Sequence, residues 1–234
     1  MSERVAKAIL FLPVVGMVVC IFMFVYYINR SVSLDNYDKT SKRMKILDSM
    51  IVVENRVEVI RRVIRKYKVN DFQAKSVARQ LVDVEMVKNV DCESMVAVLN
   101  YETGGSWCVN RISSCGAKGI TQALESTFKP WCKKNKVRYV EDETIWNEYV
   151  AVPVSMMEFC EYVNKYGYGE AFRKYVGGEN YFERNDTIGR EGAMRYVLSY
   201  ALAIKPEYDR LKKLSREITK EVENETKERL RPTR

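Results

Sequence analysis

Apolar residues along the chain predict one lipid-spanning segment followed by a series of amphipathic helices. Residues 8–28 contain no charged side chain, and a helix of this length spans roughly 30 Å, the hydrocarbon thickness of a bilayer. Tyr26 and Tyr27 stand where an aromatic belt meets the lipid headgroups. The run then continues into Asn and Arg, which does not match the small residues of a signal-peptide cleavage site. We therefore expect an uncleaved anchor in the lipid bilayer.

The charges around this anchor predict its orientation. Arg4 and Lys7 precede it on a short tail, so the positive-inside rule places the N-terminus in the cytoplasm. Basic residues that follow the anchor, such as Arg30 and Lys39, reduce the asymmetry. We expect a single-pass membrane protein whose remaining residues lie on the extracytoplasmic side.

The segment after the anchor predicts a polar linker and then an amphipathic helix. Residues 31–40 are polar and turn-rich, whereas apolar residues recur at three- and four-residue steps over 41–67. One interpretation is a stalk that pairs with another chain, either a second copy or a component of a larger complex. The other is a first helix that packs on its own domain, which we favour.

The rest of the chain also predicts helices. Asn70 and Asp71 are placed to cap the next helix, and a further helix begins near Asp91 and ends at Gly104 and Gly105. Strand-like alternation is scarce, so the expected fold class is mainly α. Residues 212–234 are highly charged without a sustained apolar stripe, which predicts a solvated helix or a frayed tail. Later helices are expected at 125–135, 144–166, 168–176 and 189–213.

The amino-acid composition limits the catalytic mechanisms that this chain can use. The 234 residues include no histidine, which excludes the Ser-His-Asp triad, the Cys-His pair and the HExxH zinc helix. Catalysis would have to use carboxylates, lysine, tyrosine, serine or backbone groups. A formal net charge of +8 favours anionic partners such as acidic lipid, nucleic acid or cell-wall polymer. No nucleic-acid recognition motif is present, so we expect no nucleic-acid partner.

The cysteines predict no metal site. The six cysteines contain no CxxC spacing, which argues against a zinc ribbon, and we expect neither a metal nor another cofactor. Cys108 with Cys115, and Cys132 with Cys160, are candidates for disulfides in an oxidising compartment. Burial as small apolar residues explains the cysteines beyond the anchor, Cys92 included, equally well.

Glu102 is the candidate catalytic acid. It follows Val98 and Leu99 by four and three residues, on the apolar side of the helix that begins near Asp91. Partial burial there would raise the pKa of the carboxyl, as a general acid near neutrality requires. Taken alone, a helix-end glutamate that pairs with a lysine or reaches water explains the position better.

The residues after Glu102 carry a resemblance to a known family. The sequence ETGGSWCVNRISSCGAKGITQALESTF resembles the signature of soluble lytic transglycosylase (SLT) domains, which belong to the goose-type lysozyme superfamily. Glu102 and Thr103 stand for the family's Glu-Ser. Residues 113–122, SSCGAKGITQ, stand for its Ser-x-x-Gly-Ala-x-Gly-Leu-x-Gln motif, after a slightly longer loop. The resemblance covers residues 72–209 or so and implies a lysozyme-like helical domain.

A third family motif, Ala-Tyr-Asn-Ala-Gly, is matched in part. Tyr175 and Gly178 agree with it, whereas Val176 replaces the family asparagine. The resemblance implies that Tyr175 contacts the catalytic carboxyl. It also implies that Tyr196, in a later Tyr-Val pair, binds substrate. The expected division of the chain is an anchor (1–30), a linker and stalk helix (31–68), a catalytic domain (69–211) and a charged tail (212–234).

The resemblance implies cleavage of peptidoglycan glycan strands. Glu102 would protonate the bond between N-acetylmuramic acid and N-acetylglucosamine and then deprotonate the muramoyl C6 hydroxyl, which gives a 1,6-anhydro end. A single acid suffices there, and no Asp or Glu lies between Glu102 and Glu125. Ser113 and Gln122, the latter on the following helix, would bind substrate, and glycines would allow close backbone approach. The full set of implied substrate-binding residues is Ser113, Gln122, Tyr175, Tyr196, Gly116 and Gly119.

Two other functions stay open. A lysozyme-type hydrolase on the same fold needs a second carboxylate, such as Glu125 or Glu179. A structural protein of a virion or envelope complex would bind glycan without cutting it, and Val176 keeps that alternative open. Small anchored enzymes of this kind resemble those of bacteriophage particles and of conjugation or secretion systems, where the 41–67 helix would contact a partner.

Overall fold

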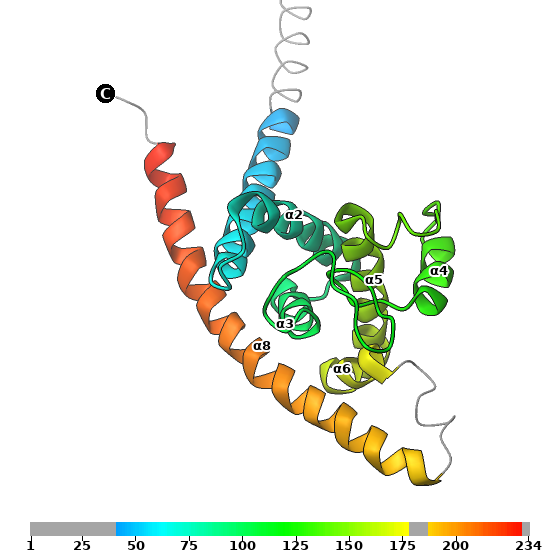
Figure 1. Cartoon of the computed structure of the whole chain (residues 1–234). Helices are drawn as coiled ribbons and strands as arrows, with labels where there is room; N and C mark the ends of the chain where they lie inside the picture. Colours follow the sequence, from blue (N-terminus) through cyan, green and yellow to red (C-terminus); the bar gives the residue numbers. More distant parts are fainter. Residues whose placement is uncertain (1–40, 178–186, 231–234) are drawn as a thin grey trace, which may run out of the picture. The chain divides into compact units, whose positions relative to one another are not determined.

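The computed structural model describes residues 41–177 and 187–230, with only the backbone described at 176–177 and 187–201. The described ranges are mainly helical, which confirms the predicted fold class, and Figure 1 shows this arrangement. Residues 112, 118 and 123 form two isolated β-bridges. The helices are an unlabelled one at 41–65, α2 (Asp71–Lys88), α3 (Cys92–Glu102), α4 (Glu125–Lys134), α5 (Glu148–Tyr166), α6 (Tyr168–Gly177) and α8 (Thr187–Arg229).

The chain divides into two compact units, Met1–Val52 and Val53–Arg234. The described part of the first unit, residues 41–52, is helical and exposes apolar side chains such as Met44, Leu47 and Met50. The predicted anchor at 8–28 lies outside the described residues. From residue 41 onward, none of the described helices is both long enough and apolar enough to cross a membrane.

The second half of the 41–65 helix belongs to the second unit. Ile60, Val63 and Ile64 have no exposed surface, because their three- and four-residue spacing places them on one face against the core. From Val53 onward this helix therefore packs on its own domain, which is the interpretation that we favoured over a stalk. The compact unit begins at Val53 rather than at residue 69.

Local signals fix the ends of α2. The Asn70 side chain accepts a hydrogen bond from the backbone N–H of Gln73 at 2.9 Å, so the predicted cap forms. Asn89 ends the helix in the left-handed conformation, with φ of 54°. These ends need only residues within one turn, which explains why the sequence predicts them.

Helix α3 lies at the centre of the second unit. Each residue from Cys92 to Leu99 is buried, because α3 contacts both α2 and α8 and has apolar or small side chains on all sides. Glu93 is the one charged residue among them, and it is only 5% exposed. The helix therefore holds a buried charge at one end and Glu102 at the other.

Helix α8 packs along the domain as far as its C-terminal part. Leu211, Ser215, Ile218 and Val222 are buried at three- and four-residue steps, so this part of the segment 212–234 is not a solvated or frayed tail. α8 contacts α6 and α3. The apolar stripe was hard to recognise in the sequence because Ser215 interrupts it and charged residues surround it.

The five described cysteines are unpaired. Cys92, Cys132 and Cys160 are buried, whereas Cys108 and Cys115 are exposed. The buried thiols pack as small apolar groups, and Cys160 Sγ lies 3.8 Å from the sulfur of Met95. Neither of the two candidate disulfides is formed in this structure.

Candidate functional site

The C-terminal end of α3 places Glu102 at the boundary between the core and solvent. Glu102 is the last residue of the helix and is partly buried. The buried Thr103 hydroxyl donates to the Leu99 carbonyl at 2.8 Å and closes the last turn. Gly104 and Gly105 then take φ values of 57° and 76°, which residues other than glycine adopt at a cost. The predicted end of this helix is therefore correct.

Tyr175 of α6 packs against Phe159, and the charge of Glu102 reaches it. The ring of Tyr175 meets that of Phe159 edge-on at 5.8 Å, and its hydroxyl donates to the Thr121 carbonyl at 3.4 Å. Burial raises the pKa of Tyr175 well above its ordinary value, and the nearby charge of Glu102 raises it further. The charge of Glu102 therefore reaches a residue that is far from it in the sequence.

Ser113 closes a tight turn in the loop after α3. Its hydroxyl accepts a hydrogen bond from the Ala117 backbone N–H at 2.9 Å, and its own N–H donates to the Ala117 carbonyl at 2.9 Å. Gly116, within the turn, has a φ of 80° and open space around it. The Ser113 hydroxyl therefore has a structural role in this conformation.

Gln122 lies in a turn before α4, not on the following helix as expected, because that helix begins only at Glu125. Its side-chain amide donates to the carbonyls of Gly119, at 2.7 Å, and Arg111, at 3.2 Å. Its φ of 47° is left-handed. This amide therefore holds the loop closed.

Close backbone packing fixes the same loop against its neighbours. A Cβ on Gly119 would lie 2.9 Å from the Ile145 carbonyl oxygen, so the backbones approach where only glycine fits. A Cβ on Gly104 would lie 2.8 Å from the guanidinium of Arg111, which places this cation at the α3 C-terminus. A positive charge there interacts favourably with the helix dipole.

Three predicted positions have no described side chain. Tyr196 belongs to α8 and Val176 to α6, and only their backbones are described. Glu179, the carboxylate proposed for a hydrolase, lies outside the described residues. Glu125 accepts a hydrogen bond from the Tyr139 hydroxyl at 2.6 Å and lies 3.7 Å from the ammonium of Lys118.

Sequence analysis missed Glu158 of α5. This carboxyl is partly buried and accepts a hydrogen bond from the Tyr162 hydroxyl at 3.0 Å. Burial raises the pKa of Glu158 to about 7, and the charge of Glu158 also raises the pKa of Tyr175. The only signal in the sequence was a glutamate within the largely apolar run MMEFC.

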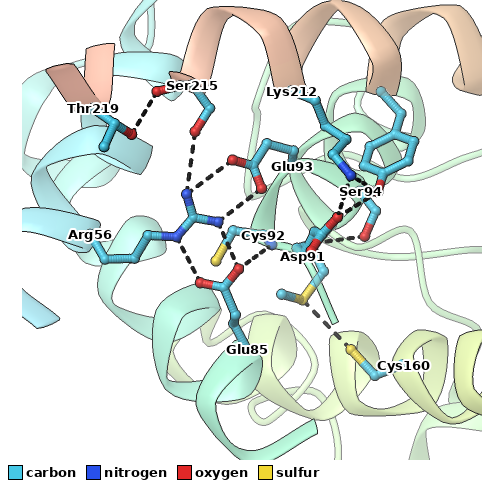
Figure 2. Close-up of polar contacts among 12 residues, drawn as sticks. Arg56, Glu85, Asp91, Cys92, Glu93, Ser94, Cys160, Lys212, Ser215 and Thr219 are labelled. Carbon is cyan, nitrogen blue, oxygen red and sulfur yellow. Dashed lines mark hydrogen bonds and ion pairs between the residues drawn. The ribbon is translucent and has the colours of Figure 1, made fainter. Parts of the chain in front are cut away.

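A charged cluster fixes the other end of α3 (Figure 2). Arg56 binds Glu93 through both terminal nitrogens, at 3.0 and 2.9 Å, and binds Glu85 at 2.8 and 2.6 Å. It also donates to the Ser215 hydroxyl of α8 at 3.2 Å. Glu85 in turn accepts from the Cys92 backbone N–H at 3.0 Å. Four helices therefore meet at this cluster, which holds α3 in place.

Two of the hollows on the surface of the described residues lie away from Glu102. One of about 620 Å³ lies beside α4 and includes Lys129, Lys133 and Tyr139, and one of about 350 Å³ lies between the 53–65 helix segment and the end of α8. The first hollow is also lined by Glu125, the carboxylate considered for a hydrolase, and neither lining includes Glu102 or a predicted substrate-binding residue. Within the described ranges, no group of three or more acidic or cysteine side chains is arranged to hold a metal ion.

Three comparisons of this chain with known proteins were negative. A scan against protein-family models, a search of curated proteins and a search of solved structures each found no match to this chain. The functional argument therefore rests on the residues of this chain and their geometry.

Proposed function

We propose that the chain is a membrane-anchored peptidoglycan lytic transglycosylase with a lysozyme-like helical domain. In this proposal residues 8–28 anchor the protein with its N-terminus in the cytoplasm, and the helical domain acts on glycan strands outside the membrane. The enzyme would open the wall locally, as needed for phage entry or for an envelope-spanning machine.

The effect of the Glu102 charge on Tyr175 is the observation that supports this proposal. The resemblance pairs a catalytic carboxyl at the end of one helix with a tyrosine from a distant motif. In the fold, Tyr175 lies close enough to Glu102 for the carboxylate charge to act on its hydroxyl.

The surroundings of Glu102 suit an acid that also serves as a base. Glu102 is partly buried at the end of a helix whose residues from Cys92 to Leu99 lie in the core. Its proton would pass to the glycosidic oxygen as the bond to C1 breaks. The C6 hydroxyl oxygen would then bond to C1, and its proton would return to Glu102. The sum is a release of the 4-hydroxyl and an anhydro ring without uptake of water.

The products of the full-length chain test this proposal. The chain, purified in detergent, is incubated with peptidoglycan, and the soluble fragments are analysed by mass spectrometry. We expect 1,6-anhydromuramoyl ends, lighter by one water than the ends that hydrolysis leaves. Hydrated ends would indicate a lysozyme-type hydrolase instead, and binding without products would indicate a structural glycan-binding protein.

A matched pair of variants tests the assignment of Glu102. Glu102→Gln keeps the size of the side chain but removes its titratable proton, so we expect a loss of at least a hundredfold in rate. Glu141→Gln is the control, because Glu141 is exposed in the turn between α4 and α5 and is not a candidate site residue. Full activity of Glu102→Gln would exclude Glu102 as the acid.

A further inference from the structure

The helical segment 41–52 exposes a group of apolar side chains. Met44, Ile46, Leu47 and Met50 are 55%, 58%, 53% and 57% exposed, and none of the residues from 41 to 52 is buried. Isolated apolar residues are common on protein surfaces, whereas a contiguous group of them marks a surface that binds something. This segment lies outside the candidate site, so the proposed chemistry does not explain it.

These apolar side chains lie on one side of the helix. With 3.6 residues per turn, successive positions are about 100° apart around the axis. On this spacing five apolar residues share an arc of roughly 160°, and the rest of the circumference holds polar residues, with Val52 as the exception. The five residues of this apolar arc are Met44, Ile46, Leu47, Met50 and Ile51, and those opposite include Lys45, Asp48 and Ser49.

The width of the apolar arc favours a lipid surface over a second helix as its occupant. A helix that pairs in a coiled coil needs only a narrow apolar seam, about two positions in every seven. A helix that lies in a membrane interface has a broad apolar side opposite a polar one. Within the described ranges, no helix is long and apolar enough to cross a membrane. The contact that suits residues 41–52 is therefore with the surface of a bilayer.

The charges of the segment favour an anionic bilayer. Lys42, Arg43 and Lys45 stand within four positions at its start, and Asp48 is the only acidic residue from 41 to 52. Basic side chains next to an apolar helix side are attracted to the phosphates of acidic lipids. Arg43 falls inside the apolar arc, where its long side chain can reach the phosphates while its stem contacts lipid.

The same charges disfavour a second copy of this chain as the occupant. Two copies with anchors in one membrane would pair in parallel, so Arg43 of each copy would face its counterpart across the apolar arc. Like charges that are brought together in this way oppose association. The paired helices would also be short, because residues 41–52 make fewer than two heptads.

The length of the preceding chain keeps the segment close to the membrane. Residues 29–40 separate it from the proposed anchor at 8–28, and a stretch of this length spans at most about 45 Å. The anchor therefore holds the segment within reach of the lipid headgroups at a high effective concentration.

We propose that residues 41–52 form a helix that lies along the surface of an anionic bilayer. The apolar arc, with Leu47 near its centre, contacts the acyl chains, whereas Lys45 and Asp48 face water. This inference rests on the proposed anchor but needs no cleavage of glycan. Because the second compact unit begins at Val53, the helical domain starts next to the membrane surface in this arrangement.

Quenchers carried by lipid test this contact in the full chain. Met50→Trp places a fluorophore on the apolar arc, and Ser49→Trp, the matched control, places one on the polar side. Both positions are exposed, so neither substitution disturbs the core. Each variant is reconstituted in vesicles of phosphatidylglycerol and phosphatidylcholine, with a fixed fraction of the phosphatidylcholine brominated on its acyl chains. The signal of the wild type, which has three tryptophans, is subtracted.

The expected result is at least about twofold more quenching in Met50→Trp than in Ser49→Trp, because only the apolar arc enters the acyl region. Quenching should decrease when phosphatidylcholine replaces all of the phosphatidylglycerol, and it should not depend on the ratio of protein to lipid. Circular dichroism checks that both variants keep their helices.

Three other results would contradict parts of this proposal. Equal quenching at the two positions would overturn the lipid contact. Equal quenching in the two kinds of vesicles would overturn the preference for anionic lipid. Quenching of Met50→Trp that disappears as the ratio of protein to lipid rises would assign the apolar arc to a second copy of the chain instead.

Flotation and cleavage separate this inference from the proposed function. A chain that does not float with the vesicles would overturn both the anchor and the surface contact. A chain that floats and shows the excess quenching in Met50→Trp, but releases no anhydro ends from peptidoglycan, would reject the proposed enzyme and leave the contact in place. An active chain with equal quenching at the two positions would reject the contact alone.

Discussion

Arg56 binds Glu93 through both terminal nitrogens of its guanidinium, and it thereby anchors the start of α3 to the helix at 53–65. Glu93 is buried on a largely apolar helix, and Arg56 is its ion-pair partner among the described residues. The opposite end of α3 carries Glu102. The position of the candidate catalytic residue therefore depends on a cluster of charges at the other end of its helix.

Removal of the Arg56 guanidinium should destabilise the domain strongly. Arg56→Ala leaves Glu93 and Glu85 without a counter-charge in a largely buried setting, and we expect a loss of about 3 kcal/mol in the free energy of unfolding. Chemical denaturation measures it. Arg79→Ala is the control, because the pair that Arg79 forms with Glu54 is exposed and should contribute less than about 1 kcal/mol. Equal effects of the two substitutions would contradict the structural role of the cluster.

The start of the folded domain can be tested with two fragments. Ile60, Val63 and Ile64 are fully buried, and each contributes roughly 1.5–3 kcal/mol on burial, a large share of the 5–15 kcal/mol of a typical domain. We expect residues 53–234 to unfold cooperatively and residues 69–234 not to do so. Thermal melts followed by circular dichroism, with limited proteolysis, distinguish the two fragments. Cooperative unfolding of the shorter one would place the first helix outside the domain.

Stability should fall as the pH rises from 4.5 to 7 because of Glu158. In the unfolded chain this carboxyl ionises near its ordinary value of 4.5, and in the folded chain burial raises its pKa to about 7. The folded state therefore binds more protons between these values, and ionisation favours unfolding. The full difference is about 3 kcal/mol and is reached above pH 7. Urea unfolding at pH 5 and pH 8 measures this change. We expect Glu158→Gln to lose much less stability than the wild type between the two pH values. An equal loss in both proteins would assign the pH dependence to another group.

The stability of the loop that contains Ser113 and Gln122 should depend on Gly119. Both Gly119→Ala and Gly116→Ala force alanine into a left-handed conformation, which costs about 1–2 kcal/mol. Only at Gly119 would the new Cβ also meet a backbone oxygen, that of Ile145 at 2.9 Å. We expect Gly119→Ala to be the more destabilising by more than about 1 kcal/mol in thermal unfolding. A similar loss at the two positions would mean that the loop can move away from Ile145.

The described cysteines should divide into two classes of reactivity. Cys108 and Cys115 are exposed, whereas burial raises the pKa of Cys160 to about 12 and also raises that of Cys92 and Cys132. Since the thiolate is the reactive form, we expect iodoacetamide to modify the two exposed thiols in the native protein and the other three only after unfolding. Mass spectrometry of tryptic peptides measures which thiols are modified. Rapid modification of Cys160 in the native protein would show that the core around Cys160 opens to solvent.

The ends of helices could be predicted from the sequence because their signals are local. The cap at Asn70 and the glycine pair after Glu102 act within one helical turn. The burial of α8 beyond residue 211 could not be predicted in the same way. Its stripe contains Ser215, which is polar but buried because Arg56 from a distant helix donates to it.

The site was predictable only in part for the same reason. The motifs singled out Glu102 and Tyr175, whereas Glu158 belongs to no motif and its relation to Tyr175 depends on how α5 packs beside α6. Gln122 was expected on a helix, but a left-handed backbone keeps it in a turn.

The sequence alone therefore determined the mainly helical fold, the ends of individual helices and the candidate acid, since these depend on neighbours within a few residues. Only the tertiary structure decided that Arg56 would hold α3 and that two carboxyls would act on one tyrosine. Burial and charge at each of these groups come from side chains on other helices, and that arrangement exists only once the helices pack together.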